Sequence, residues 1–245
     1  MKLSGNTQSS SVRTFFTVIV LICVVVLSFS WGVLIMHKKI FPYEQLRSAA
    51  FAVLGNRLTA PRPRVSFFNE FPTKADVVMI GDSLTEAALW NEIFPKIKIA
   101  NRGVGRDTTN DVLGRLESII SVEAKKAFLM IGINDIYHGR TIDEIMDDYG
   151  RIVSRLQEAG IVVYVQSTVE CAKENCGRKL QRVRELNQRL RIYAAKNNIQ
   201  YIDINKGMTS DADGLLSAFT YDGVHLNGKG FLVWSKMIES QVRSK

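Results

Sequence analysis

The sequence predicts an α/β protein: a flavodoxin-like three-layer sandwich with a five-stranded parallel sheet, preceded by one N-terminal transmembrane helix. The first observation behind this prediction is that short apolar runs alternate along the chain with longer amphipathic segments. Such alternation favours a parallel sheet with helices on both faces. The second observation is an uncharged apolar stretch at residues 15–36. A chain of 245 residues is long enough for one domain with a large core and additional segments.

The predicted strands are apolar runs bounded by glycine or polar residues, and the predicted helices are the amphipathic segments between them. We expect strands at residues 77–80, at the start of 97–109, and at 127–131, 161–165 and 200–204. We expect helices at residues 109–120, 141–159, 178–197 and 227–242. The chain has no Gly-x-Ser-x-Gly motif, which disfavours the larger α/β-hydrolase fold, and no Walker or Rossmann glycine motif.

A serine follows the first predicted strand, in the segment Gly81-Asp82-Ser83-Leu84. In α/β folds, ligands bind at the carboxyl edge of the strands. Ser83 is therefore a candidate nucleophile, provided that other segments supply a base and donors for an oxyanion.

The candidate base is His225, one of three histidines in the chain. Asp222 precedes it by three residues, so its carboxylate can hold the ring by Nδ1 and leave Nε2 to take a proton from a serine hydroxyl. The alternative is that Asp222 caps the following helix and that His225 is an ordinary surface residue. His138 is a rival base without a carboxylate at the same spacing, and His37 lies at the border of the apolar N-terminal stretch.

Two further segments offer hydrogen-bond donors for an oxyanion. Asn134 follows the third predicted strand, where its side-chain amide can stabilise charge on a carbonyl oxygen. The alternative is that Asn134 and Asp135 only form a turn. In residues 97–109 a short strand leads into a loop with glycines and then to Asp107, the expected N-cap of a helix. Amides at a helix start have no intrahelical partner and can serve as oxyanion donors.

Four segments resemble, in order and character, the motifs of the GDSL or SGNH hydrolase family. They are Gly-Asp-Ser-Leu at 81–84, the Asn-Arg-Gly loop at 101–108, Gly-x-Asn-Asp at 132–135 and Asp-x-x-His at 222–225. The resemblance covers roughly residues 74–243 and points to a membrane-anchored, bacterial-type member. It implies the SGNH hydrolase fold and a serine esterase that needs no cofactor and no metal.

The resemblance also implies roles for individual residues. Ser83 would be the nucleophile, His225 the general base and Asp222 the acid that orients it. The oxyanion hole would consist of the backbone N–H of Ser83, an amide of the glycine-containing loop and the side chain of Asn134.

One loop position departs from the family's pattern. The residue that donates its amide is usually a glycine directly before the Asp-Thr pair, and here it is Arg106, with Gly105 as the alternative donor. The main-chain N–H survives this change, whereas the dihedral freedom of a glycine is lost. The Arg106 side chain is expected to face solvent, to narrow the cleft, or to hold an anionic group of the substrate.

The chain is expected to divide into an N-terminal tail at 1–14, a transmembrane signal anchor at 15–36, a basic stem at 37–73 and the hydrolase domain at 74–245. The uncharged stretch is long enough to cross a bilayer as a helix. A cleaved signal peptide is the main alternative, although its apolar stretch is usually about 7–15 residues long. Residues 1–71 carry eight Lys or Arg against two Glu, so most of the net charge of +8 belongs to the tail and the stem.

Arg57, Arg62 and Arg64 suggest a basic tether near anionic headgroups, or a plain solvated linker. The basic run of the 178–197 helix has no aromatic residues interleaved with it and is read as a solvated face, not a nucleic-acid site; its members are Arg178, Lys179, Arg182, Arg184, Arg189 and Arg191. Cys171 and Cys176 either close a small disulfide, which needs an oxidising compartment, or remain free thiols. With the enzyme class, they favour a catalytic domain outside the cytoplasm, on the periplasmic or cell-surface side.

The expected activity is ester hydrolysis through an acyl-enzyme on Ser83, with an O-acetyl or other short acyl group on a glycan as the first substrate to consider. The alternatives are a lysophospholipase or thioesterase, an acyltransferase to a glycan, and a catalytically silent binding domain that only Arg106 favours. The expected partners are an acylated small-molecule, glycan or lipid substrate and, through the N-terminal helix, the membrane.

Overall fold

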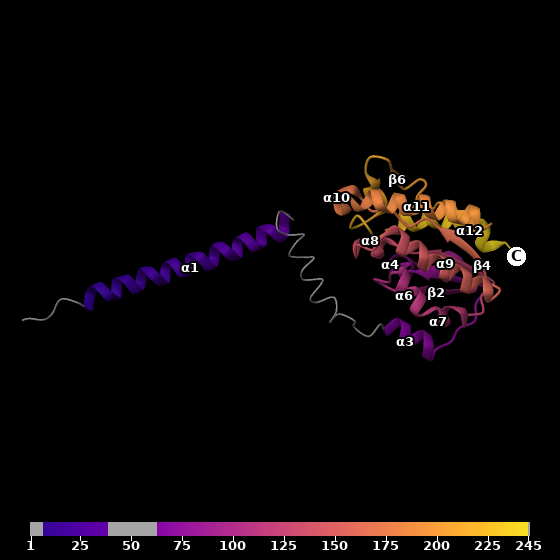
Figure 1. Cartoon of the computed structure of the whole chain (residues 1–245), viewed down its shortest axis with the longest axis horizontal. Helices are drawn as coiled ribbons and strands as arrows, with labels where there is room; N and C mark the ends of the chain where they lie inside the picture. Colours follow the sequence, from indigo (N-terminus) through magenta and orange to yellow (C-terminus); the bar gives the residue numbers. More distant parts are fainter. Residues whose placement is uncertain (1–6, 39–62, 245) are drawn as a thin grey trace, which may run out of the picture. The chain divides into compact units, whose positions relative to one another are not determined.

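The computed structural model describes residues 7–38 and 63–244, and the chain divides between Arg62 and Pro63 into two units. The described part of the first unit is one long helix, α1 (Thr7–Lys38) (Figure 1). Its residues 15–34 have a mean hydropathy of 2.6 and are numerous enough to cross a bilayer. The prediction of one apolar helix at the N-terminus is confirmed.

The second unit is built on a parallel sheet of five strands in the order β2-β1-β3-β4-β5. The strands are β1 (Val77–Gly81), β2 (Ile99–Gly103), β3 (Lys126–Met130), β4 (Val162–Gln166) and β5 (Gln200–Ile202). The predicted flavodoxin-like sheet is therefore confirmed. Gly81 at the end of β1 pairs with Gly103 of β2 and Met130 of β3, so three strands end at one edge of the sheet.

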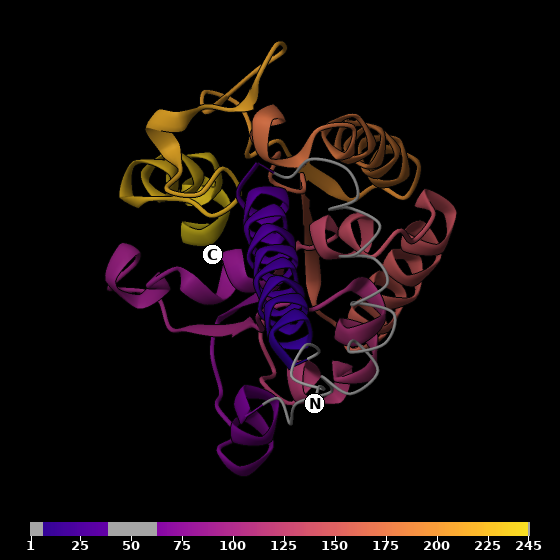
Figure 2. The ribbon, with the colours of Figure 1, turned by 90° about the vertical axis from the view of Figure 1, so that its left-hand side faces the viewer.

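Helices cover both faces of the sheet because the residues of β1 alternate between two cores. Val78 and Ile80 pack with one group of helices, whereas Val77 and Met79 pack with the other. The first group is α6 (Thr109–Gly114), α7 (Leu116–Ile120), α9 (Ile142–Glu158) and α11 (Lys179–Lys196). The second group is α4 (Ser83–Ala87), α5 (Trp90–Ile93) and α12 (Gly228–Arg243). Figure 2 shows α12, in yellow, on one side of the sheet and the rose and orange helices on the other.

Two local expectations are wrong. The helix predicted at 109–120 is broken at Arg115, whose φ of −118° departs from helical geometry and whose side chain turns inward to Asp107 at 2.6 Å. Asp107 is buried in this ion pair and does not cap the helix. Thr108 is the N-cap instead, and it forms a reciprocal capping box with Asp111.

The compact unit begins earlier than residue 74. Helix α3 (Pro63–Glu70) packs on it through Phe68, which is buried. Arg64 Nε donates to the carbonyl of Gly103 at 2.6 Å, so Arg64 lies on the globular unit and not in a tether. Arg57 and Arg62 lie outside the described residues.

The short helices α4 and α5 were not predicted, and neither were four further short elements. They are α8 (Ile133–Tyr137), α10 (Lys173–Cys176), the hairpin β6 (Thr209–Ser210) with β7 (Gly214–Leu215), and a 3-10 turn, η1 (Ser217–Phe219). Helix α10 lies between β4 and α11, whereas β6, β7 and η1 lie between β5 and α12.

Candidate active site

Ser83 lies at the carboxyl edge of the sheet as the first residue of α4. Asp82 is the N-cap of this helix, and its Oδ1 accepts the N–H of Leu84 at 3.0 Å. The first N–H groups of a helix have no intrahelical acceptor, so the N–H of Ser83 is available to a ligand. The Ser83 side chain is half-buried.

His225 meets Ser83 from a loop 142 residues further along the chain. Its Nε2 lies 3.0 Å from Ser83 Oγ, and its Nδ1 lies 2.7 Å from Asp222 Oδ2. A carboxylate only accepts hydrogen bonds, so Nδ1 carries the proton and Nε2 can accept from the serine hydroxyl. The three residues that the sequence singled out therefore form one continuous hydrogen-bonded chain.

The loop at 220–226 is shaped by its own hydrogen bonds. Asp222 Oδ1 accepts the N–H groups of Val224 at 2.9 Å and His225 at 2.7 Å. Thr220 Oγ1 donates to the carbonyl of His225 at 2.6 Å. Asp222 does not cap the following helix, because Asn227 is the N-cap of α12.

These contacts keep Asp222 ionised. Partial burial by itself raises the pKa of its carboxyl, but the hydrogen bonds from the backbone and ring of His225 and from Val224 outweigh burial. The net result is a pKa of Asp222 below its ordinary value. The carboxylate that holds the His225 ring thus stays charged at a lower pH than an ordinary aspartate does.

The loop after β2 brings a backbone amide toward the same edge. Arg106 has a φ of +68°, the left-handed conformation that glycine adopts most readily, and its side chain is exposed. The loop thus keeps the backbone shape of a glycine although the residue is an arginine. Within residues 63–244 no acceptor pairs with the Arg106 N–H. Gly105, the alternative donor, uses its own N–H to bind Glu86 Oε2 at 2.5 Å.

Asn134 lies in α8, directly after β3. Its Nδ2 donates to the carbonyl of Asp107 at 3.0 Å, which fixes the side-chain amide beside the glycine-containing loop. An amide nitrogen has two hydrogens, so one remains for a ligand. The Asn134 side chain thus contacts the glycine-containing loop.

Sequence reasoning missed two residues that hold the glycine-containing loop. Glu86, three residues after Ser83, binds the amide of Gly105, and Arg64 lies 3.8 Å from the Glu86 carboxylate. Arg64 also donates to the carbonyl of Gly103. The (i, i+3) spacing of Ser83 and Glu86 on α4 was a possible signal for Glu86, whereas no local pattern indicated Arg64.

Buried acids lie behind the site. Asp135 accepts from the N–H and hydroxyl of Thr109 and from Arg140 at 2.7 Å. Burial nevertheless raises its pKa. These contacts tie α8, which carries Asn134, to the start of α6.

The other candidate residues lie elsewhere. His138 is exposed at the C-terminal end of α8, and the ring that meets Ser83 is that of His225.

Within the described ranges 7–38 and 63–244, no three His, Cys, Asp or Glu residues are grouped so that they could hold a metal ion. Cys171 and Cys176 form a disulfide.

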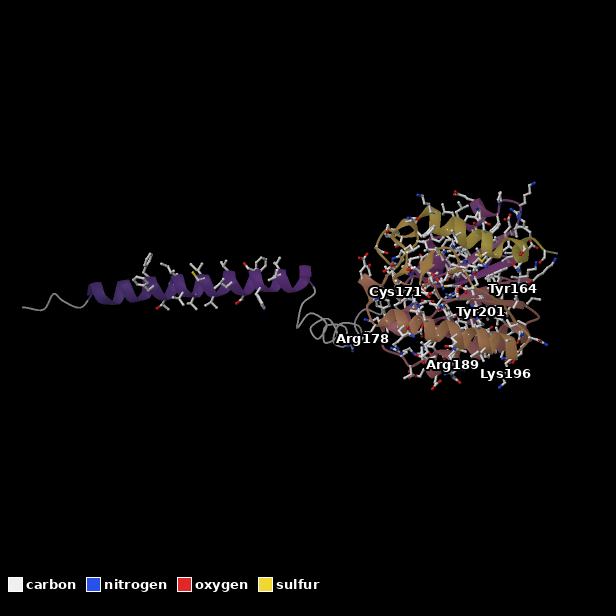
Figure 3. All side chains as sticks on the ribbon, turned by 90° about the horizontal axis from the view of Figure 1, so that it is seen from above. Tyr164, Cys171, Arg178, Arg189, Lys196 and Tyr201 are labelled. Carbon is white, nitrogen blue, oxygen red and sulfur yellow. A yellow bond between two sulfur atoms is a disulfide. The ribbon has the colours of Figure 1, made fainter. Side chains whose placement is uncertain are left out.

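Three basic residues of α11 form ion pairs with acidic side chains. Arg184 binds Glu170 at 3.0 Å, Arg189 binds Asp143 at 2.8 Å, and Arg191 binds Asp203 at 2.9 Å. Figure 3 labels Arg178, Arg189 and Lys196 along this helix. The pairing agrees with a solvated helix face.

Comparison with known proteins supports an acyl-cleaving enzyme. The model of the GDSL-like Lipase/Acylhydrolase family matches residues 79–232. Human platelet-activating factor acetylhydrolase IB subunit alpha2 is 30% identical over 168 residues, which cover 64% of this chain and 71% of that protein.

Solved structures share the fold. A putative platelet activating factor from Streptococcus pneumonia has a TM-score of 0.71 and 21% identity, covering 79% of this chain and 98% of that one. A catalytic mutant of Axe2, an acetylxylan esterase from Geobacillus stearothermophilus, has a TM-score of 0.59 and 15% identity, covering 71% and 97%.

The family match and the curated relatives define the class of this protein as an ester hydrolase. The chain belongs to the GDSL-like lipase/acylhydrolase family, as the resemblance of its four motifs implied.

Proposed function

We propose that this protein is a serine esterase that forms an acyl-enzyme on Ser83. The observation that carries the proposal is the hydrogen-bonded chain from Ser83 through His225 to Asp222, at 3.0 and 2.7 Å. This arrangement is what an ordinary serine hydroxyl requires to become a nucleophile, because the hydroxyl loses its proton only to a base within hydrogen-bond reach.

The reaction proceeds in two halves. Ser83 Oγ attacks the ester carbonyl carbon while its proton moves to His225 Nε2, and Asp222 stabilises the resulting imidazolium. The tetrahedral intermediate then expels the alcohol, which takes the proton from His225. In the second half, water gives a proton to His225 and attacks the acyl-enzyme, and collapse of the new intermediate releases the acid and restores Ser83.

Three donors are proposed for the oxyanion of each intermediate. They are the N–H of Ser83, the N–H of Arg106 and the free amide hydrogen of Asn134. Arg106 is proposed over Gly105 because the N–H of Gly105 already donates to Glu86. Each such donor typically contributes about 10²–10³ in rate.

The substrate that we propose is a short acyl ester, with an O-acetyl group on a glycan as the first case. The human relative and the Geobacillus structural neighbour are both named for acetyl ester cleavage. A lipid ester is the second candidate, and the observation that favours it is the apolar helix at 15–34. Transfer of the acyl group to a glycan hydroxyl would use the same residues.

Hydrolysis of p-nitrophenyl acetate and of a long-chain p-nitrophenyl ester, together with acetylated xylo-oligosaccharides and a lysophospholipid, tests these assignments. We expect the acetyl substrates to be cleaved and activity to disappear in Ser83→Ala. Preference for the long chain and the lysophospholipid would replace the glycan proposal with the lipid one. Acylation of an added sugar acceptor in preference to hydrolysis would indicate a transferase. No turnover by the folded protein would leave a silent binding domain.

We also propose that α1 anchors the chain as a single span and that the catalytic unit lies outside the cytoplasm. The span of 15–34 supports the anchor, and the disulfide between Cys171 and Cys176 supports an oxidising compartment. The test is fractionation of cells followed by protease treatment of the intact cell or spheroplast. The catalytic unit should remain with the membrane and be accessible to the protease. A protected unit would place it in the cytoplasm, and a soluble, shortened chain would indicate a cleaved signal peptide.

A further inference from the structure

We infer that the disulfide-closed segment from Cys171 to Cys176 positions the loop that carries Asp222 and His225, with Asn175 as its main contact residue. This inference rests on the proposed function of Ser83, His225 and Asp222. It assigns a positioning role to a segment that lies outside the four family motifs.

Two hydrogen bonds join the segment to the loop. The N–H of Ala172 donates to the carbonyl of Gly223 at 2.7 Å, and Asn175 Nδ2 donates to the carbonyl of Asp222 at 2.8 Å. Both acceptors belong to the tight turn in which the Asp222 carboxylate holds the His225 ring. A shift of Asn175 would therefore act directly on the backbone of the carboxylate residue.

The contact between the two segments is close. Gly223 has a φ of +83°, and a Cβ at this position would lie 2.2 Å from the side-chain amide of Asn175. Only a glycine leaves room for Asn175 to reach the carbonyl of Asp222. The turn and the segment thus fit each other at both Gly223 and Asn175.

The segment is itself tied to the domain. The N–H of Lys173 donates to the carbonyl of Asp213 at 2.8 Å, Ala172 bridges to Gly214, and both cysteines are buried. Helix α10 has only four residues, too few to be stable alone. The disulfide closes the chain around it and holds Asn175, which lies between the two cysteines, in a narrow range of positions.

Two sets of contacts act on the loop: one fixes its internal shape and the other fixes its position on the domain. The hydrogen bond that Thr220 donates to the carbonyl of His225, and the one that Asp222 accepts from the N–H of His225, fix the internal shape of the loop. The hydrogen bonds that Ala172 and Asn175 donate fix the position of that loop on the domain. They therefore also fix the position of His225 Nε2 relative to Ser83. A small displacement of a catalytic group is costly, since a misplacement of about 1 Å can reduce the rate about 10²-fold.

The test compares Asn175→Ala with Asn197→Ala in the full chain in detergent micelles. Asn197 is an exposed asparagine whose Nδ2 makes a similar bond, to the carbonyl of Tyr193 at 2.7 Å, at the end of α11. We expect Asn175→Ala to lower both kcat and the rate of reaction with a fluorophosphonate about tenfold, with KM and melting temperature nearly unchanged. Asn197→Ala should match the wild type. Equal rates for the two variants, or a loss confined to KM, would overturn the inference.

A second arm uses reduction of the disulfide. Dithiothreitol delivers two electrons and two protons to Cys171 and Cys176, which become thiols, while the reagent becomes a cyclic disulfide. The fluorophosphonate rate of the wild type should fall on reduction. The double variant Cys171→Ser with Cys176→Ser should start at the lower rate and not respond. An unchanged wild-type rate, with both thiols confirmed by alkylation, would overturn the inference. If the wild-type protein does not react with the fluorophosphonate, the proposed function itself is refuted.

Discussion

Replacing Asp82 by Asn is expected to remove a pH dependence from the stability of the globular unit. Asp82 is fully buried directly before Ser83, and among residues 7–38 and 63–244 its Oδ2 has no hydrogen-bond partner. Burial is the main cause that raises the pKa of Asp82 to about 7, and the nearby carboxylates of Asp107 and Asp135 add to it. The hydrogen bond from Leu84 opposes the rise.

The magnitude follows from the two pKa values. The unfolded chain ionises Asp82 near its ordinary value of 3.8, whereas the folded chain keeps the proton until the pH approaches about 7. Between these values the unfolded state gains the ionised form and the folded state does not, so stability falls as the pH rises. The limiting slope is about 1.4 kcal/mol per pH unit, which corresponds to a loss of about 2 kcal/mol from about pH 5 to about pH 7.

The assay is urea unfolding of the part of the chain from about residue 60, at about pH 5 and at about pH 7. Tryptophan fluorescence reports the unfolding. Asn keeps the acceptor for Leu84 and cannot ionise. The free energy of unfolding of Asp82→Asn, relative to wild type, should therefore increase by about 2 kcal/mol between the two conditions. Asp211→Asn, which removes an exposed carboxylate, serves as the control and should run parallel to the wild type. If Asp82→Asn also runs parallel, Asp82 is ionised in both states and the reasoning fails.

Three further predictions concern the oxyanion site. Asn134→Ala should lower kcat about 10²–10³-fold with KM nearly unchanged in ester hydrolysis, and a loss confined to KM would contradict its role. Glu86→Ala frees the amide of Gly105 and should lower kcat up to about tenfold, so wild-type kinetics would show that this bond does not hold the loop. Arg106→Gly should keep the activity and raise the free energy of unfolding by about 1 kcal/mol, because glycine adopts positive φ without strain. A melting curve checks this, and a lower stability of the variant would contradict it.

The fold was largely predictable because local sequence patterns mark most of its strands and helices. Apolar runs bounded by polar residues or glycine located the strands, and Gly81 and Gly103 end β1 and β2 at the expected edge. The pairing of His225 with Ser83 was predictable from the Asp-x-x-His spacing and the resemblance to a family. The roles that follow from this pairing remain proposals.

The missed features depend on side-chain contacts that hydrophobic periodicity does not encode. Arg64 binds Gly103 across 39 positions, and no pattern near residue 64 indicates that partner. The break at Arg115 likewise depends on the buried carboxylate of Asp107. The helical periodicity of 109–120 contains no information about that ion pair, so a single continuous helix was the natural prediction.

The most direct test of the central claim is covalent labelling of the folded protein with a fluorophosphonate, followed by peptide mass analysis. We expect one adduct, on the peptide that contains Ser83. We also expect that labelling disappears in Ser83→Ala and becomes very slow in His225→Ala, because the serine then has no base. Absence of an adduct on the folded wild type, or an adduct on another residue, would contradict the assignment of Ser83 as the nucleophile.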